Sequence, residues 1–123
     1  MDSRLSHFLS WLEKDFRLIL PIEEGTILDA RDRTPFDADW VQANAHLEER
    51  FQVICPPVSI LSAIAKAREV AFKKVFAATG SHELSACSSD DIDLIAKAIV
   101  CAEESSQFIA RLRSSYSSGR IAT

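Results

Sequence analysis

The sequence contains few of the features that mark common classes of enzyme. Only three glycines occur, and none belongs to a phosphate-binding loop or a dinucleotide-binding motif. The GxSxG motif of serine hydrolases is also absent. Three histidines, His7, His46 and His82, lack the HxxxH spacing that a metal site favours, and the one carboxylate at helical spacing, Glu49 after His46, is common on any exposed helix face. The sequence therefore predicts no enzyme activity, no metal and no cofactor.

The chain also lacks long apolar runs. No run approaches the roughly 20 residues that a membrane-spanning helix needs. An acid lies within the first four residues, and Glu13, Lys14 and Asp15 interrupt the apolar positions that follow. A signal peptide has an uninterrupted apolar region instead. We therefore expect a cytoplasmic protein that makes no contact with a membrane.

Cysteine is scarce too, and the three cysteines form no CxxC pair. Cys101 lies among apolar residues and is expected to be buried. Cys55 precedes two prolines, so no helix N-terminus lowers its pKa. Cys87 lies close to Asp90 and Asp91, whose charges should raise its pKa. The exposure of Cys55 and Cys87 stays open, but neither is predicted to be a nucleophile.

One segment resembles a known catalytic motif. His82–Ser88 is similar to the phospho-accepting motif of histidine-phosphotransfer domains, which are also four-helix bundles of about this length. The resemblance implies a histidine in mid-helix, followed by a lysine and a small residue, whereas Ser85 and Ala86 stand at those positions. Gly80 and Ser81 also break the helix where the motif needs one. Phosphotransfer or another enzyme activity is therefore the third function that we consider.

Basic residues are outnumbered by acidic ones, and the acids are clustered. The chain has 14 Lys and Arg against 18 Asp and Glu, a net charge of −4. Residues 21–49 hold eight acids and two arginines, and residues 81–104 hold six acids and one lysine. A nucleic-acid-binding protein normally shows a broad basic face. The sequence therefore argues against nucleic acid and favours a protein partner with a basic surface.

The N-terminal half of the chain predicts two helices and a long connection. Leu5, Leu9, Leu12, Phe16 and Ile19 recur at helical spacing, which predicts a helix over 3–20 that Pro21 ends. Residues 21–36 contain two prolines and a glycine and show no helical period, so they are expected to form a loop or a short extended segment. A second helix is predicted over 37–53, before the Cys55-Pro56-Pro57 break.

The C-terminal half predicts a helical hairpin. A third helix is expected over 59–78, with Gly80 in the left-handed conformation after its end. A polar turn follows over 81–89, and Ser88 or Ser89 should cap the last helix. An apolar stripe then runs down that helix; its members are Ile92, Ile95, Ile99, Ala102, Ser106, Ile109, Arg113 and Tyr116.

Together these elements predict an all-α protein. We expect an antiparallel four-helix bundle with a long connection between helices 1 and 2, in which the third and fourth helices form the central hairpin. Residues 1–113 should make one domain, and residues 114–123, rich in serine, a flexible tail.

The first function hypothesis is a non-catalytic inhibitor. A small, acidic cytoplasmic protein of the immunity or antitoxin kind would bind a partner protein and occlude its active site. Trp11 lies beside the first apolar stripe and is expected in the core, whereas Trp40 lies among acids and is a candidate anchor. The predicted contact residues are Asp29, Asp32, Asp37, Asp39 and Trp40.

The second hypothesis is a regulatory bundle that holds a small apolar molecule between its helices. Phe72, Phe76, Phe108 and Ile109 would then line a cavity. A homodimer is compatible with each hypothesis, because a long last helix could extend beyond a monomeric bundle and pair there.

Overall fold

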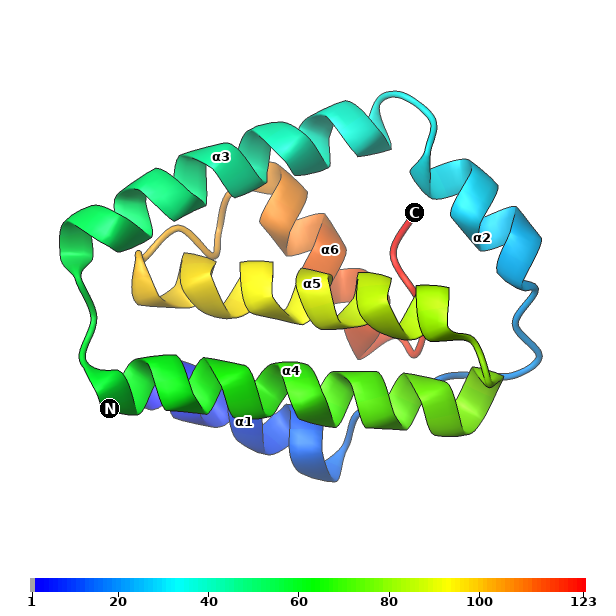
Figure 1. Ribbon diagram of the computed structural model, residues 1–123, viewed down its shortest axis with the longest axis horizontal. Helices are drawn as coiled ribbons and strands as arrows, with labels where there is room; N and C mark the ends of the chain where they lie inside the picture. The colour runs from blue at the N-terminus through cyan, green and yellow to red at the C-terminus, as the bar shows by residue number, and fades with distance from the viewer. Residues whose placement is uncertain (1) are drawn as a thin grey trace.

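The computed structural model describes residues 2–123, in which helices are joined by loops and no strand occurs (Figure 1). The all-α prediction is confirmed, but six helices replace the four that were expected. None of the six, within residues 2–123, is both long and apolar enough to cross a bilayer. The helices are α1 (Ser3–Lys14), α2 (Glu24–Arg31), α3 (Phe36–Ile54), α4 (Val58–Thr79), α5 (His82–Val100) and α6 (Gln107–Ser117).

The α4–α5 hairpin is the centre of the molecule, as predicted (Figure 1). Gly80, at φ +69°, ends α4 in the left-handed conformation that a glycine adopts without strain. The Ser81 hydroxyl then accepts a hydrogen bond from the backbone N–H of Leu84 at 3.0 Å and caps α5. The predicted turn over 81–89 is therefore wrong, because most of that segment is the first part of α5.

Small serines explain why this part of α5 looked like a turn. Ser85, Ser88 and Ser89 are buried, and the Ser89 hydroxyl donates to the backbone carbonyl of Arg68 on α4 at 3.1 Å. Serine is common in turns, but here its small side chain faces α4 and the core. The polar composition of residues 81–89 therefore led to a predicted start of α5 that is too late in the sequence.

The other long helices pack around the hairpin. α1 lies against α4 and α5, while α3 and α6 lie against α5. Trp11 of α1 packs on the core between the rings of Phe8 and Phe16, at centroid distances of 5.7 and 5.5 Å. α2 stands at one end of the molecule, and the α3–α4 connection is at the opposite end (Figure 1).

The first helix ends earlier than Pro21. α1 stops at Lys14, and the ammonium of Lys74 on α4 donates to the backbone carbonyls of Leu12, Glu13 and Phe16 at 2.7, 2.8 and 3.1 Å. A cation that satisfies the free carbonyls at a helix end stabilises that end. Ile19, expected on the buried stripe, lies outside the helix and is 67% exposed.

The expected long connection contains a short helix. α2 has eight residues and none of them is buried, so no apolar stripe marked it in the sequence. Ile27 and Leu28 are only half-buried against the core. Neither the loop nor the extended segment that was considered for residues 24–31 is found.

The last predicted helix is broken. α5 ends at Val100 and α6 begins at Gln107, with Ala102 between them at φ +57°. Ala102 and Ser106, two members of the predicted stripe, are exposed at this break. The stripe itself is real on both sides, since Ile92, Ile95 and Ile109 are buried.

The C-terminal residues pack against the molecule. α6 continues to Ser117, and the segment after it places Ile121 and Ala122 in the core at 5% and 2% exposure. Residues 114–123, expected as a flexible tail, therefore contribute buried surface.

Candidate functional site

A buried carboxylate links four helices. Asp91 of α5 has no exposed surface. Its two oxygens accept hydrogen bonds from two nitrogens of the Arg31 guanidinium at 2.7 and 2.9 Å. The indole N–H of Trp40 on α3 donates to the same carboxylate at 2.8 Å, and the hydroxyl of Tyr116 on α6 donates at 2.5 Å. We call Asp91, Arg31, Trp40 and Tyr116 the Asp91 network.

The network also reaches the C-terminal segment. Arg31 donates to the backbone carbonyl of Ala122 at 2.9 Å, and the Tyr116 hydroxyl lies 3.4 Å from that of Ser88. A buried charge is costly unless it is paired and hydrogen-bonded. The Asp91 carboxylate accepts four hydrogen bonds at the point where α2, α3, α5 and α6 meet. These bonds compensate for the cost of burying its charge.

Proton affinities in the network follow from its geometry. Burial alone would lower the pKa of Arg31, but the hydrogen bonds and charge of Asp91 outweigh it and raise that pKa above its usual value. Burial, together with the neighbouring Asp91 charge, raises the pKa of Tyr116 well above 10. Arg31 therefore stays charged and Tyr116 stays neutral, a state suited to holding helices rather than to moving protons.

The network holds α2 and α3 against α5, and the predicted contact residues lie where α2 and α3 meet. Asp29 lies on α2, Asp32 is the C-cap of that helix, and Asp37 is in the first turn of α3. All three are exposed. We call residues 29–39 the α2–α3 corner. Four of its acids were predicted as contacts, and the structure brings them to this one corner.

The charges of this corner differ from those elsewhere. Within residues 2–123, Asp29, Asp32 and Asp37 lie in no ion pair, whereas Asp39 is 3.5 Å from Arg111. The acids of the second acidic segment are mostly paired, for example Asp90 with Arg68 at 2.7 Å and Glu103 with Arg50 at 3.2 Å. Asp29, Asp32 and Asp37 outnumber Arg33, the exposed arginine of the corner, so the corner keeps net negative charge for contacts outside the molecule.

Trp40 is placed differently from the other four predicted residues. Its ring is half-buried against the core, and its N–H is committed to Asp91. The side chain thus joins α3 to α5 and leaves only part of its ring on the surface.

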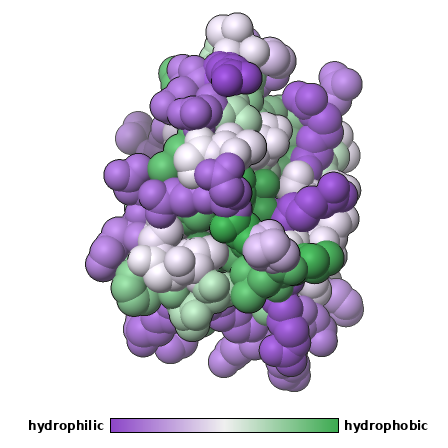
Figure 2. Space-filling view, turned by 90° about the vertical axis from the view of Figure 1, so that its right-hand side faces the viewer, coloured by the Kyte–Doolittle hydropathy of each residue, from purple (hydrophilic) through white to green (hydrophobic). Residues whose placement is uncertain are grey.

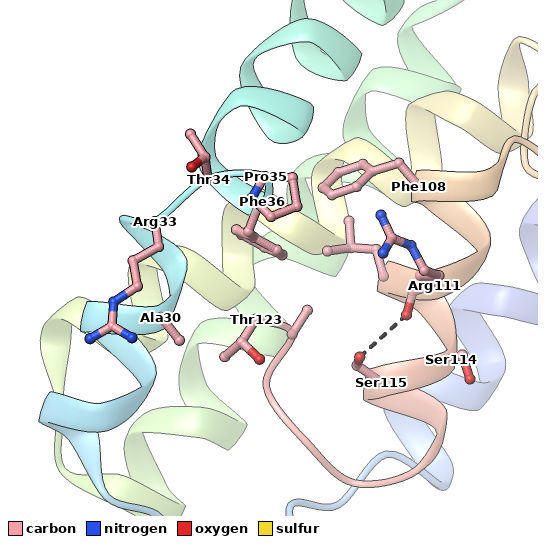
Figure 3. Close-up of a pocket in the computed structure, with 12 residues that line it drawn as sticks. Ala30, Arg33, Thr34, Pro35, Phe36, Phe108, Arg111, Ser114, Ser115 and Thr123 are labelled. Carbon is pink, nitrogen blue, oxygen red and sulfur yellow. Dashed lines mark hydrogen bonds between the residues drawn. The ribbon is translucent and has the colours of Figure 1, made fainter.

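An open groove lies beside the corner, between α2, α3 and α6. Its volume is about 600 Å³. Figure 3 shows Phe36 and Phe108 on its upper side, with Arg111 close to Phe108 and Arg33 pointing away. Along α6, on the right-hand side of the view, the Ser115 hydroxyl donates to the backbone carbonyl of Arg111 at 3.2 Å. The groove therefore offers apolar surface next to the acids.

The structure does not assemble the alternative sites. His82 is the first residue of α5, not a mid-helix residue, and its ring packs on that of Phe76 at 4.8 Å. Burial raises the pKa of the Cys87 thiol, and the charges of Asp91 and Asp90 add to the effect as predicted, although Arg31 opposes it. Within residues 2–123 no group of three His, Cys, Asp or Glu side chains could hold a metal ion.

The proposed apolar ligand site is divided between two places. Phe72 and Phe76 pack on each other at 6.3 Å, whereas Phe108 packs on Phe36 at 5.6 Å. Ile109 is buried in the core. The four side chains therefore do not line one common cavity.

Sequence reasoning missed the role of Asp91. Its place among the acids that follow the polar segment 81–89 predicted a surface charge near the start of the last helix. A signal was present, because Leu84, Ser88, Asp91 and Ile95 follow a 4-3-4 spacing that places the acid on a buried stripe. A single acid on a buried stripe needs a buried cation or hydrogen-bond donor, and here the guanidinium of Arg31 binds it.

Comparison with known proteins identifies a family for nearly the whole chain. The family model of immunity protein PIM1 matches residues 6–123. A search of curated proteins finds no match.

Proposed function

The chain belongs to the immunity protein PIM1 family, and on this premise we propose that it inhibits a partner protein by covering that protein's active site. Membership of an immunity-protein family implies binding to another protein and suggests a non-catalytic role. We propose the α2–α3 corner as the contact, with Asp29, Asp32, Asp37, Asp39 and the exposed part of Trp40. On the grounds of the sequence we also propose the cytoplasm as the place of inhibition.

The observation that carries the proposal is the unpaired acidic charge of the corner. Asp29, Asp32 and Asp37 are exposed and, within residues 2–123, in no ion pair, so a partner can meet their charge without breaking one. Opposite charge on the two surfaces accelerates association and excludes wrong partners. A partner active site with a basic rim would fit this corner.

Rigidity of the corner supports the same proposal. The Asp91 network bonds α2 and α3 to α5 through Arg31 and Trp40. Binding costs less free energy when the contact surface is already ordered in the free protein. The network therefore favours tight binding, although Trp40 is the only one of its four residues that we propose as a contact.

Charge reversal at the corner tests the contact. The partner is taken as the protein that co-purifies with the tagged chain and whose activity the chain suppresses. Replacing Asp29→Lys and Asp37→Lys should lower the association rate constant for that partner by about tenfold or more at low salt. Stopped-flow or surface-plasmon measurements give the rate, and an activity assay gives the inhibition.

A control variant separates the corner from net charge. Glu13→Lys with Glu49→Lys changes the charge of the chain equally at exposed residues of α1 and α3 outside the corner. We expect near-unchanged association for this control. Equal association rates for both variants and the unmodified chain would show that the corner is not the contact. Binding without competition by the partner's substrate would contradict occlusion of its active site.

A further inference from the structure

A second groove lies on the other side of α2 and is more apolar. It is about 610 Å³ in volume, and we call it the isoleucine groove after Ile19, Ile22, Ile27 and Ile121, which line it. Figure 2 looks onto this end of the molecule and shows hydrophobic surface through its middle and lower right, between hydrophilic groups. Glu23 and Arg120 are the charged side chains along it.

We propose that the isoleucine groove receives an apolar side chain of the inhibited partner, flanked on the partner by basic groups. This inference rests on the proposed function and names the apolar part of the same interface. The acidic corner and the groove would then bind one continuous surface of the partner.

The first argument is continuity with the corner. α2 forms one wall of the isoleucine groove through Thr26, Ile27 and Ala30, with Glu23 at its N-cap, and the same short helix carries Asp29. Ala30 also lines the groove beside the corner. A partner seated on the acids of α2 therefore reaches the isoleucine groove without crossing another element.

The second argument is what the corner lacks. Protein interfaces concentrate their binding energy in buried apolar or aromatic anchors surrounded by polar groups. Trp40, the large aromatic residue predicted for that role, is half-buried and bonded to Asp91. The groove beside the corner offers some apolar surface through Phe36 and Phe108, and the isoleucine groove adds a more apolar surface on the other side of α2.

The third argument is that the exposed apolar residues are held in place. Ile19 is 67% exposed, yet its backbone N–H donates to the carbonyl of Gly119 at 2.8 Å. A Cβ on Gly119 would lie 2.8 Å from the side chain of Ile19, so only glycine allows this close approach. An ordered apolar surface loses little conformational entropy when a partner covers it.

Charge selects the partner's side of the contact. Glu23 and Arg120 line the groove, and Glu24 and Asp29 of the adjoining α2 are exposed, so acids outnumber bases here. An apolar side chain surrounded by Lys or Arg complements this arrangement, whereas one surrounded by acids would be repelled.

Removal of the exposed apolar side chains tests the groove. Ile19→Ser with Leu20→Ser changes residues that are 67% and 55% exposed, so the melting temperature should move by only about 2 °C. The dissociation rate constant of the partner complex should rise by about 10- to 100-fold with little change in the association rate. Asp29→Lys with Asp37→Lys should instead lower the association rate constant and change the dissociation rate constant little. The groove and the corner are therefore tested by different rate constants, and either proposal can be contradicted without the other.

The opposite end of the molecule supplies a control. Val53→Ser with Val58→Ser removes two apolar side chains that are 77% and 75% exposed, and the partner's dissociation rate should stay unchanged. An unchanged dissociation rate for the Ile19 and Leu20 variant would overturn the inference, as would an effect confined to the Val53 and Val58 variant. So would sedimentation showing that the free chain is a dimer which the Ile19 and Leu20 variant makes monomeric, with partner binding intact.

Discussion

The α4–α5 hairpin and α2 are held in the molecule by different physical forces. The hairpin buries a continuous set of apolar side chains, among them Ile64, Ala71, Leu84 and Ile95. α2 buries no residue and is fixed through the charge of Arg31. Apolar burial gives stability that depends little on direction, whereas a bonded ion pair fixes orientation. A bonded ion pair therefore suits a surface that must present its charges in one fixed geometry.

Loss of the Asp91 carboxylate should give the largest effect. Asp91→Ala leaves the Arg31 guanidinium, only 10% exposed, without its partner. Breaking a buried pair in this way costs about 3–5 kcal/mol. Denaturant unfolding measures the loss, and amide hydrogen exchange should accelerate in α2 more than in the hairpin.

A neighbouring acid provides the control for that prediction. Asp90 lies next to Asp91 in α5 but is half-exposed and pairs with Arg68 on the surface. Asp90→Ala should cost less than about 1 kcal/mol. Similar losses for the two variants would mean that burial of Asp91 is not what holds α2.

Removal of one donor should have an intermediate effect. Tyr116→Phe keeps the ring that packs on Phe16 at a centroid distance of 5.9 Å but deletes the hydroxyl bonded to Asp91 at 2.5 Å. A hydrogen bond to a charged group contributes about 1.5–3 kcal/mol. Denaturant unfolding should show a loss in this range, and a loss below about 0.5 kcal/mol would contradict the network.

The same hydroxyl predicts a dependence on alkaline pH. Folding raises the pKa of Tyr116 above its usual value of 10 through burial and the Asp91 charge. Its contribution to stability is therefore complete below pH 10 and declines as the pH rises further, because only the unfolded state releases the proton easily. Unfolding free energies measured from pH 9 to 11.5 should fall less steeply for Tyr116→Phe than for the unmodified chain.

A conservative change in the hairpin should have the smallest effect. Ile95→Val removes one methylene from a fully buried side chain, which costs about 0.5–1.5 kcal/mol. Because the Asp91 network is untouched, partner affinity should stay unchanged. A large loss of affinity would show that α2 and the hairpin are coupled through apolar packing instead.

Sequence periodicity predicted α3 and α4 well. α3 and α4 begin and end within a residue or two of the predicted limits, and Gly80 ends α4 as expected. Spacing of apolar residues is sufficient there because burial of one face determines the helix. The break between α5 and α6 was missed because the stripe resumes after it, and neither proline nor glycine marks residues 101–106.

The end of α1 and the whole of α2 could not be predicted, because polar contacts with distant residues determine them. α1 ends where Lys74 bonds its last carbonyls, and that lysine is 60 residues away from the helix end in the sequence. α2 depends on Arg31 and on Asp91, which lies on another helix. Contacts between residues so far apart in the sequence produce no periodic pattern of residues within one segment. The acids of the α2–α3 corner could be predicted from the local composition. The hydrogen bond from Trp40 to Asp91 could not.

Hydrogen exchange of the free chain and of its complex with the inhibited partner tests the central claim most directly. If α2 carries the contact and the Asp91 network holds it ready, partner binding should slow amide exchange in residues 19–39 and leave residues 53–61 unchanged. Slowed exchange confined to residues 53–61, with residues 19–39 unaffected, would contradict the account.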